Sequence, residues 1–254
     1  MQDANGYSIL ITGGGSGLGA GIAQYMAKQG ARLTISGRRA EKLEEVAAQI
    51  GPACSICVGD VTNAEDRARM IDTAVAHGGG LQGLANVAGN ILRGPITELD
   101  PDAVLDLMNT NVVAGMALTG LATPHLEVQG GAILFIGSVH TRRAFPGASP
   151  YAATKGAVET LSQVLAAELG PKGIRVNCLL PGAVPTEINV RAGIASSTEE
   201  NLARLQSMTA EHPLGRIGTP QDISEAADYL MRAEWTTGTS VVVDGGLALG
   251  VTYK

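Results

Sequence analysis

Short apolar segments alternate along this chain with longer segments whose apolar residues recur at helical spacing, and this alternation restricts the possible folds most strongly. The apolar segments predict β-strands at residues 8–12, 32–36, 53–58, 83–87, 132–137, 175–180 and 240–244. The segments between them predict helices at residues 18–29, 40–50, 64–77, 101–122, 151–169, 198–211 and 220–232. Strands that alternate with helices favour a parallel sheet with right-handed crossovers.

We therefore expect an α/β fold: a Rossmann-like, doubly wound, seven-stranded parallel sheet with helices on both faces. Hydrophobic residues make up 45% of the chain and aromatic residues only 3%. The core must then consist mainly of Ala, Val, Ile and Leu, as in parallel strands that helices cover on both sides. No repeat or linker interrupts the pattern, so one domain should span residues 1–254. Residues 183–213 are small, polar and irregular before they become helical, which predicts a lid over a site.

Charge and composition exclude several kinds of partner. The 18 basic and 24 acidic residues give a net charge of −6 without a long basic cluster, so nucleic acid is not an expected partner. No run approaches the ~18–20 apolar residues of a membrane span, and no signal peptide is visible. We therefore expect a cytoplasmic protein with no membrane partner.

The cysteines and histidines do not predict a metal site. Cys54 and Cys57 are three residues apart on a predicted strand and should point to opposite faces, as small buried hydrophobes rather than a redox or metal pair. Together with Cys178, this usage suits a reducing compartment. None of the four histidines lies in ligand spacing with another, so no metal is expected.

The first predicted strand runs directly into a glycine-rich loop and a helix. The segment is Thr12-Gly13-Gly14-Gly15-Ser16-Gly17-Leu18-Gly19. Glycine permits a positive φ and a close approach of backbone to a ligand. The start of a helix offers unpaired N–H groups and a partial positive charge to a pyrophosphate. Placed between a first strand and a helix, this loop predicts that a dinucleotide binds here.

The next two strand ends bear on the choice of dinucleotide. Arg38 follows the second strand, and no acid occurs until Glu41. An acid near this position binds the ribose 2′-hydroxyl of NAD, whereas an Arg accommodates the 2′-phosphate of NADP. Arg38 therefore favours NADP(H), with a solvated Arg at a helix start as the alternative. Asp60, after the third strand, could accept a hydrogen bond from the adenine amino group or cap a helix, a role that Thr62 or Asn63 could fill instead.

Tyr151 and Lys155 lie four residues apart in a predicted helix, so their side chains should share one helix face. A nearby positive charge favours the phenolate, and we expect Lys155 to lower the Tyr151 pKa toward neutrality. A tyrosine with such a pKa can give or take a proton at a carbonyl or hydroxyl oxygen.

The order of the motifs resembles that of the short-chain dehydrogenase/reductase family, in the compact branch of about this length. The matching features are the loop at residues 12–19, the segment Asn86-Val87-Ala88-Gly89, Asn111, Ser138 thirteen residues before Tyr151, Pro181-Gly182 followed by Thr186, and Asp244-Gly245-Gly246. Val87 stands where the family motif has a second Asn. The resemblance covers nearly the whole chain.

This resemblance implies a role for each of the matching side chains. Tyr151 would be the acid or base on the substrate oxygen, and Lys155 would also bind the nicotinamide ribose. Ser138 would hydrogen-bond the substrate oxygen, and the backbone carbonyl of Asn111 would hold a water that links Lys155 to solvent. His140 would line the substrate pocket beside Ser138 and Tyr151, unless it is an ordinary loop histidine. The expected cofactor contacts are Gly13, Gly15, Ser16, Gly17, Leu18, Gly19, Arg38, Asp60, Val61, Asn86, Ala88, Gly89, Tyr151, Lys155, Pro181, Gly182, Val184 and Thr186.

The function implied is that of an NAD(P)-dependent oxidoreductase acting on CH–OH groups, which interconverts a secondary alcohol and a ketone. Residues 192–208 include small and apolar side chains, which favour a small, hydrophobic or cyclic substrate. The resemblance also implies a homotetramer whose faces include the helices at 101–122 and 151–169.

Two alternatives remain open. A 3-oxoacyl thioester reductase acting on an acyl carrier protein or coenzyme A would need a basic surface, which Arg142 and Arg143 could supply unless they are a solvated loop pair. A non-catalytic regulator that senses dinucleotides would be expected to lack Tyr151 or Lys155, and both are present. Enoyl reductases of this fold space the Tyr and Lys more widely than the three intervening residues found here.

Overall fold

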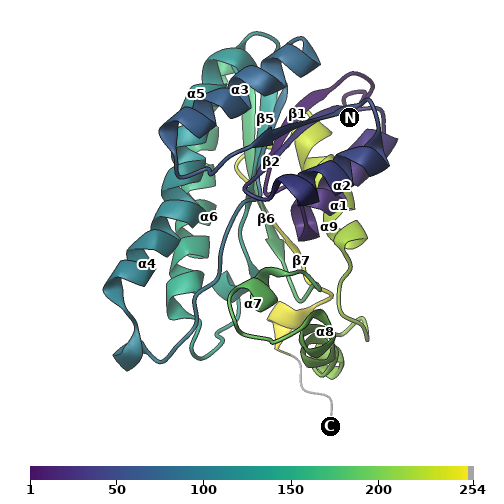
Figure 1. Cartoon of the computed structure of the whole chain (residues 1–254). Helices are drawn as coiled ribbons and strands as arrows, with labels where there is room; N and C mark the ends of the chain where they lie inside the picture. The colour runs from purple at the N-terminus through teal and green to yellow at the C-terminus, as the bar shows by residue number, and fades with distance from the viewer. Residues whose placement is uncertain (251–254) are drawn as a thin grey trace.

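The computed structural model describes residues 1–250, and within them the strands form one parallel sheet (Figure 1). The strands are β1 (Ser8–Thr12), β2 (Arg32–Gly37), β3 (Cys54–Val58), β4 (Gly83–Asn86), β5 (Gly131–Ile136), β6 (Ile174–Pro181) and β7 (Ser240–Val243). Their order in the sheet is β3-β2-β1-β4-β5-β6-β7, and all neighbouring strands are parallel. The predicted doubly wound, seven-stranded sheet is confirmed.

Helices cover both faces of this sheet, as Figure 1 shows. Their bounds are α1 (Gly17–Lys28), α2 (Ala40–Ile50), α3 (Ala64–Gly78), α4 (Pro101–Met108), α5 (Ala114–Glu127), α6 (Ser149–Leu169), α7 (Ile188–Arg191), α8 (Thr198–Gln206) and α9 (Pro220–Arg232). Buried side chains of α1, α2 and α9 form one core layer, and those of α3, α5 and α6 form the other.

Alternate residues of each strand supply the two core layers, because successive side chains of a strand point to opposite faces. In β1, Ile9 and Ile11 pack with α1, α2 and α9, whereas Leu10 packs on the opposite side. Cys54 and Cys57 of β3 divide in the same way, so the sequence correctly placed them on opposite faces.

The strand order places a crevice at the carboxyl end of β1. This strand pairs with β2 on one side and with β4 on the other. The chain therefore leaves β1 in one direction and returns to build the second half of the sheet in the other. Open α/β sheets bind their ligands at such a switch point, outside the carboxyl ends of the strands.

The helix predicted at residues 101–122 is longer and less regular than expected. A π-helical turn at Asn109–Val113 joins α4 to α5, and α5 continues through Pro124 to Glu127. Leu126 is fully buried beyond the proline, so packing of this last turn opposes the helix-breaking tendency of Pro124. The helix predicted at 198–211 ends at Gln206, and the single turn of α7 was not predicted.

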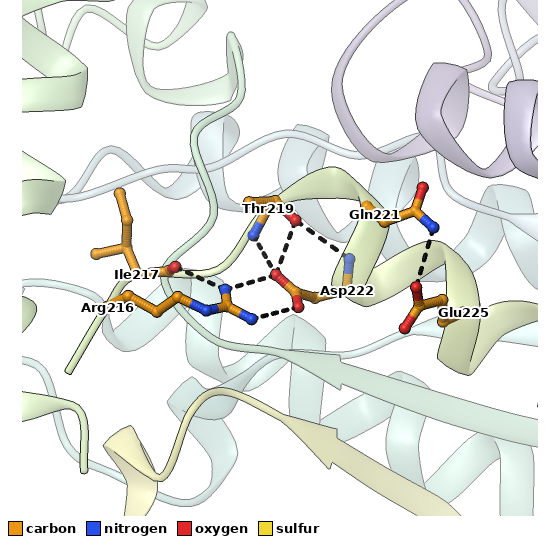
Figure 2. A network of polar contacts seen from close by, with 6 residues as sticks. All are labelled: Arg216, Ile217, Thr219, Gln221, Asp222 and Glu225. Atoms are coloured by element: carbon orange, nitrogen blue, oxygen red, sulfur yellow. Dashed lines mark hydrogen bonds and ion pairs between the residues drawn. The ribbon is translucent and has the colours of Figure 1, made fainter. Parts of the chain in front are cut away.

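The polar network in Figure 2 fixes the start of α9, the residue at which the sequence predicted this helix to begin. The Thr219 hydroxyl accepts a hydrogen bond from the Asp222 backbone N–H, and the Asp222 carboxylate accepts one from the Thr219 N–H, which completes a capping box. Arg216 donates to both carboxylate oxygens of Asp222, at 2.6 and 2.8 Å. The adjoining Pro220 lies so close to α1 that a Cβ on Gly21 would come within 2.9 Å of it. The network therefore helps to position α1, which begins at the glycine loop.

The helical segment Pro101–Glu127 is long and apolar enough to cross a membrane by length and composition, and 33% of its most apolar part is buried. One such helix is weak evidence, because core helices of soluble proteins meet the same criteria. The expectation of no membrane partner therefore stays a prediction.

Candidate active site

The glycine loop leaves the start of α1 open beside a cavity. Ser16 precedes the helix with an extended backbone, and its side chain caps none of the first N–H groups. Gly13 and Gly17 have φ values of 68° and 55°, in the left-handed region that favours glycine. A Cβ on Gly19 would lie 2.3 Å from the carbonyl oxygen of Gly13. Uncapped N–H groups on a glycine-rich loop, where few side chains obstruct the backbone, fit the pyrophosphate of a dinucleotide.

Thr12 ties the end of β1 to the loop that follows β4. Its hydroxyl oxygen accepts hydrogen bonds from the backbone N–H groups of Val87 and Ala88, at 3.0 and 3.1 Å. These bonds involve only the backbone of Val87, so the loop is held whatever side chain this position carries. Asn86 instead directs its amide to the hydroxyl of Thr119, 3.4 Å away.

Two arginines follow β2 and have different partners. Arg38 is exposed and lies 3.6 Å from the Asp60 carboxylate. Arg39 donates to the Ser16 hydroxyl at 3.1 Å and to the Glu187 carboxylate at 2.8 Å. The sequence offered no basic residue within the glycine loop itself, but folding brings Arg39 against it. Arg39 thereby connects the loop to the segment predicted as a lid.

Asp60 does not cap a helix. Its carboxylate accepts hydrogen bonds from the backbone N–H and the hydroxyl of Thr62, at 2.9 and 2.8 Å. Asn63 caps α3 by accepting a bond from the Asp66 N–H. Of the alternatives that the sequence left open, Asn63 therefore takes the capping role, and Asp60 lines the cavity.

Tyr151 and Lys155 lie on one face of α6 as predicted, but the predicted direction of the Tyr151 pKa was wrong. Burial raises the pKa of Tyr151 to about 12, and the Ser138 hydroxyl and the Arg93 charge lower it by less. The Lys155 ammonium donates to the Ile136 carbonyl at 2.8 Å and lies 5.5 Å from the centre of the Tyr151 ring. Burial lowers the pKa of Lys155 itself to about 8. Burial disfavours both the Tyr151 phenolate and the Lys155 ammonium. This effect outweighs the attraction between the two charges that the sequence spacing suggested.

Ser138 is the first of three connected polar side chains. Its hydroxyl oxygen lies 2.9 Å from Nδ1 of His140, and Nε2 of His140 lies 3.4 Å from a guanidinium nitrogen of Arg93. The imidazole packs against the rings of Phe145 and Tyr151, with centroids 4.4 and 5.1 Å apart. Burial, then the charges of Arg93 and Lys155, lower the pKa of His140 to about 4. The imidazole is therefore neutral at physiological pH.

Asn111 lies in the π-helical turn behind the cavity. Its side-chain oxygen accepts from the Asn90 N–H at 2.8 Å. Its amide nitrogen donates to the Asn90 carbonyl and to the Thr154 hydroxyl, both at 3.0 Å. The side chain thus fastens the loop after β4 to α6, beside Lys155. π-Helical turns often occur at functional sites, but the predicted water held by the Asn111 carbonyl stays a prediction.

One cavity of about 290 Å³ extends from the glycine loop to Tyr151. It is lined by most of the residues predicted for the site, namely Gly13, Ser16, Gly17, Leu18, Gly19, Arg38, Asp60, Val61, Ala88, Gly89, Ser138, His140, Tyr151, Lys155, Pro181, Gly182, Val184 and Thr186. Gly15, Asn86 and Asn111 are not among its lining residues. The structure therefore joins the predicted dinucleotide site to the predicted reaction site.

Several lining residues were not predicted from the sequence. Arg93 enters from the loop after β4, and Arg204 enters from α8. The apolar walls near them include Ile91, Val139, Phe145, Leu205 and Met208. These residues lie on loops or on helix ends, and no local sequence pattern marks which of their side chains face the cavity.

Within residues 1–250, no group of three or more His, Cys, Asp or Glu side chains is placed to hold a metal ion. The cysteines of this part of the chain are free thiols, and burial raises the pKa of Cys54 to about 11 and of Cys178 to about 12.

This chain is similar to several known oxidoreductases. A family model described as enoyl-(acyl carrier protein) reductase matches residues 13–248. L-fucose dehydrogenase of Bos taurus is 32% identical over 253 residues, which cover 98% of this chain and 92% of that protein. A crystal structure of 3-ketoacyl-(acyl-carrier-protein) reductase from Brucella melitensis, complexed with NADH, superimposes with a TM-score of 0.87 at 30% identity, covering 96% of this chain and 99% of that one.

A short-chain dehydrogenase/reductase of unknown function from Caenorhabditis elegans, solved with cofactor, gives a TM-score of 0.91 at 28% identity over 98% of both chains. The glycine loop at a helix start, the switch-point cavity and these likenesses agree on nicotinamide dinucleotide binding. The chain belongs to the short-chain dehydrogenase/reductase family of oxidoreductases.

Proposed function

We propose that this protein interconverts a secondary alcohol and a ketone with NAD(P). The observation that carries the proposal is the single cavity that begins at the glycine loop and ends at Ser138 and Tyr151. A bound nicotinamide dinucleotide would supply the atom that gives or takes the hydride. The chain must then bind the substrate oxygen and move its proton, and Tyr151 and Ser138 are the groups placed to do so.

Tyr151 serves as the proton donor or acceptor. Because its phenol is protonated at physiological pH, the donor role is favoured. A phenol whose pKa is raised to about 12 is neutral at physiological pH, so it can give a proton to a ketone oxygen. Ser138 offers a second hydrogen bond to the same oxygen. Lys155, with a pKa of about 8, gains and loses a proton readily, and it lies between Tyr151 and the Asn111 region in our proposed proton route. Asn111 fixes the backbone around that route.

The cofactor contacts proposed are those that line the cavity, and NADP(H) is favoured through Arg38. This residue is 62% exposed in its side chain and lies at the cavity edge, where it can turn toward a 2′-phosphate. Arg39 is engaged by Ser16 and Glu187, so it supports the loop instead.

Three alternative functions are weaker candidates: a thioester reductase, an enoyl reductase and a non-catalytic dinucleotide sensor. A carrier-protein thioester reductase would need accessible basic residues, but Arg142 is paired with Glu159, and Arg143 with Glu211 at 2.6 Å. Enoyl reductases space the Tyr and Lys more widely than this chain does. A dinucleotide sensor without catalysis would not need a Ser and a Tyr together at the end of the cavity.

The predicted homotetramer and cytoplasmic location remain proposals. The tetramer is supported by exposed apolar side chains on and between the helices expected to form its faces: Leu105, Val113, Met116, Leu121 and Val164. A light-scattering mass close to the 26.0 kDa of one chain would contradict it.

The test is a Tyr151→Phe variant assayed against a panel of cyclic, aromatic and aliphatic ketones and alcohols with both dinucleotides, following nicotinamide absorbance. We expect turnover by the wild-type protein and none by the variant, whose binding of reduced cofactor, measured by fluorescence, should persist. Tyr229→Phe, on the exposed face of α9, is the matched control and should turn over normally. Turnover that survives in Tyr151→Phe would contradict the mechanism.

A further inference from the structure

Two arginines from distant parts of the chain line the reaction end of the cavity. Arg93 comes from the loop after β4, and Arg204 comes from the last turn of α8. Both line the same cavity as Ser138 and Tyr151. The Nε atoms of both guanidinium groups are buried and have no hydrogen-bond partner within residues 1–250. Each therefore carries a donor that the described part of the protein leaves unused.

No carboxylate in this part of the chain neutralises them. Only two acids line the cavity, Asp60 and Glu187, and these lie near Arg38 and Arg39 at the dinucleotide end. Neither Arg93 nor Arg204 forms an ion pair within residues 1–250. His140 supplies no charge, since it is neutral and only offers its Nε2 atom to Arg93.

The two guanidinium groups also act on one another. Burial lowers the pKa of Arg93, and the Arg204 charge lowers it further, so the two lie close enough to repel. A partly buried pair of like charges is costly unless a counter-charge meets it. Guanidinium groups bind carboxylates and other oxyanions through paired N–H bonds, which makes an anion the matching partner.

Arg93 lies close to the two residues proposed to bind the substrate oxygen, Tyr151 and Ser138. The Arg93 charge acts directly on the Tyr151 phenol, and Arg93 contacts the histidine that touches Ser138. A substrate whose oxygen meets Tyr151 and Ser138 would therefore place groups only a few atoms away beside Arg93.

Arg204 is positioned by a polar connection to the cofactor segment. Asn201, one turn earlier on α8, donates to the Thr186 carbonyl at 3.0 Å and accepts from the Asn189 amide at 2.9 Å. Asn201 and Asn189 are both buried. Arg204 thus projects from a helix that is fixed to Thr186, an expected cofactor contact, rather than from a free loop.

We propose that the substrate carries an oxyanion, in the first instance a carboxylate, a few atoms from its carbinol carbon, and that Arg93 and Arg204 bind it. This inference rests on the proposed function and names its substrate class: short hydroxy acids and their oxo acids with an apolar body against Ile91, Leu205 and Met208. In the oxidative direction the carbinol carbon gives a hydride to the oxidised nicotinamide, and its hydroxyl proton leaves through Tyr151 to solvent. The carboxylate takes no part in the bond changes.

The experiment compares 4-oxopentanoate with its methyl ester, and acetoacetate with methyl acetoacetate, in wild-type protein and in Arg204→Met. An oxo sulfonate of similar length shows whether the site takes oxyanions in general. Wild-type kcat/KM should be at least about tenfold higher for each acid than for its ester, because a site with unpaired donors rejects a ligand that cannot pair them. This ratio should fall about tenfold or more in Arg204→Met and partly recover in Arg204→Lys. Arg32→Met, on the exposed start of β2, is the matched control and should keep the wild-type ratio.

A binding measurement separates this inference from the proposed function. With reduced cofactor present, 4-oxopentanoate should raise the wild-type melting temperature more than its ester does, and Arg204→Met should abolish the difference. Equal kcat/KM and equal thermal shifts for acid and ester would overturn the anion site, even if neutral ketones are reduced through Tyr151. A thermal shift specific to the acid, without turnover of any ketone, would support the anion site while the proposed reaction fails. If Arg204→Met does not fold, Arg204→Gln serves in its place.

Discussion

The Nδ1 atom of His140 lies 2.9 Å from the hydroxyl oxygen of Ser138, and the other imidazole nitrogen faces Arg93. A guanidinium can only donate, so Nε2 of the neutral imidazole must accept and Nδ1 must carry the proton. The backbone N–H of His140 donates to the same Ser138 oxygen at 3.3 Å. Both acceptor positions of Ser138 are then in use, and its own proton is left to donate to a substrate oxygen.

This arrangement predicts a positioning role for His140. The His140→Leu variant removes the Nδ1 donor, so the Ser138 hydroxyl can turn away, and kcat should fall roughly 10- to 100-fold, less than for direct loss of an oxyanion donor. In His140→Asn the amide nitrogen can replace Nδ1 and should restore part of kcat. The cofactor KM should change little in either variant. Equal kcat losses in the two variants would show that His140 only packs against Tyr151 and Phe145.

The strands could be predicted from sequence because each is a short apolar run whose ends are marked by turns, and β1 and β5 are buried along their whole length. α9 was predicted correctly for a local reason as well, since Thr219, Pro220 and Asp222 specify its start within one turn. α5 was predicted too short because the burial of Leu126 depends on helices and strands far away in sequence. Local patterns therefore determined the elements, and tertiary packing determined where this helix stopped.

The candidate site likewise has features that the local sequence predicts and others that depend on tertiary packing. Spacing alone placed Tyr151 and Lys155 on one helix face, and a motif order placed Ser138 beside them. The Tyr151 pKa could not be predicted, because it depends on how completely other elements bury the phenol. Arg93 and Arg204 were missed because two arginines from separate loops and helices converge only in the folded chain.

Gly19 should not tolerate even a methyl group. A Cβ there would lie 2.3 Å from the carbonyl oxygen and 2.7 Å from the carbonyl carbon of Gly13, both backbone atoms that cannot yield without moving the loop. Overpacking of this kind costs about 1–3 kcal/mol, so Gly19→Ala should weaken binding of reduced cofactor by roughly 5- to 150-fold. Fluorescence titration measures this. Gly170→Ala, where a Cβ meets nothing within 4 Å, is the control, and unchanged binding in Gly19→Ala would mean that the loop is not the pyrophosphate site.

Arg38 should distinguish the two dinucleotides. Its side chain is exposed at the cavity edge, and its only ion-pair partner within residues 1–250, Asp60, lies at the long distance of 3.6 Å. It is therefore free to pair with a 2′-phosphate, and Arg38→Ala should raise KM for NADP(H) by about tenfold or more, in line with a lost charged hydrogen bond. KM for NAD(H) should change far less. Arg32→Ala, at the opposite end of the same strand, controls for loss of charge, and equal effects of Arg38→Ala on both cofactors would exclude a phosphate contact.

We expect the buried charge of Lys155 to lower the free energy of unfolding. Burial lowers its pKa from the ordinary lysine value of 10.5 to about 8, so below pH 8 the folded protein keeps a charge that burial disfavours. Between pH 8 and 10.5 the unfolded chain binds more protons than the folded protein, and the free energy of unfolding must rise with pH across that window. The shift corresponds to about 3 kcal/mol, against which the hydrogen bond to the Ile136 carbonyl contributes about 1 kcal/mol.

The Lys155→Met variant should therefore be inactive but more stable than the wild type by roughly 2 kcal/mol at about pH 7. This advantage should shrink as the pH rises through the window above 8, because the wild-type lysine then loses its charge. Urea unfolding of both proteins at several pH values measures the difference directly. Lys172→Met, which removes an exposed ammonium that pairs with Glu127 at 3.2 Å, should change stability little at any pH. A Lys155→Met variant that is less stable at every pH would mean that Lys155 is held uncharged or is paired more strongly than its contact with Ile136 indicates.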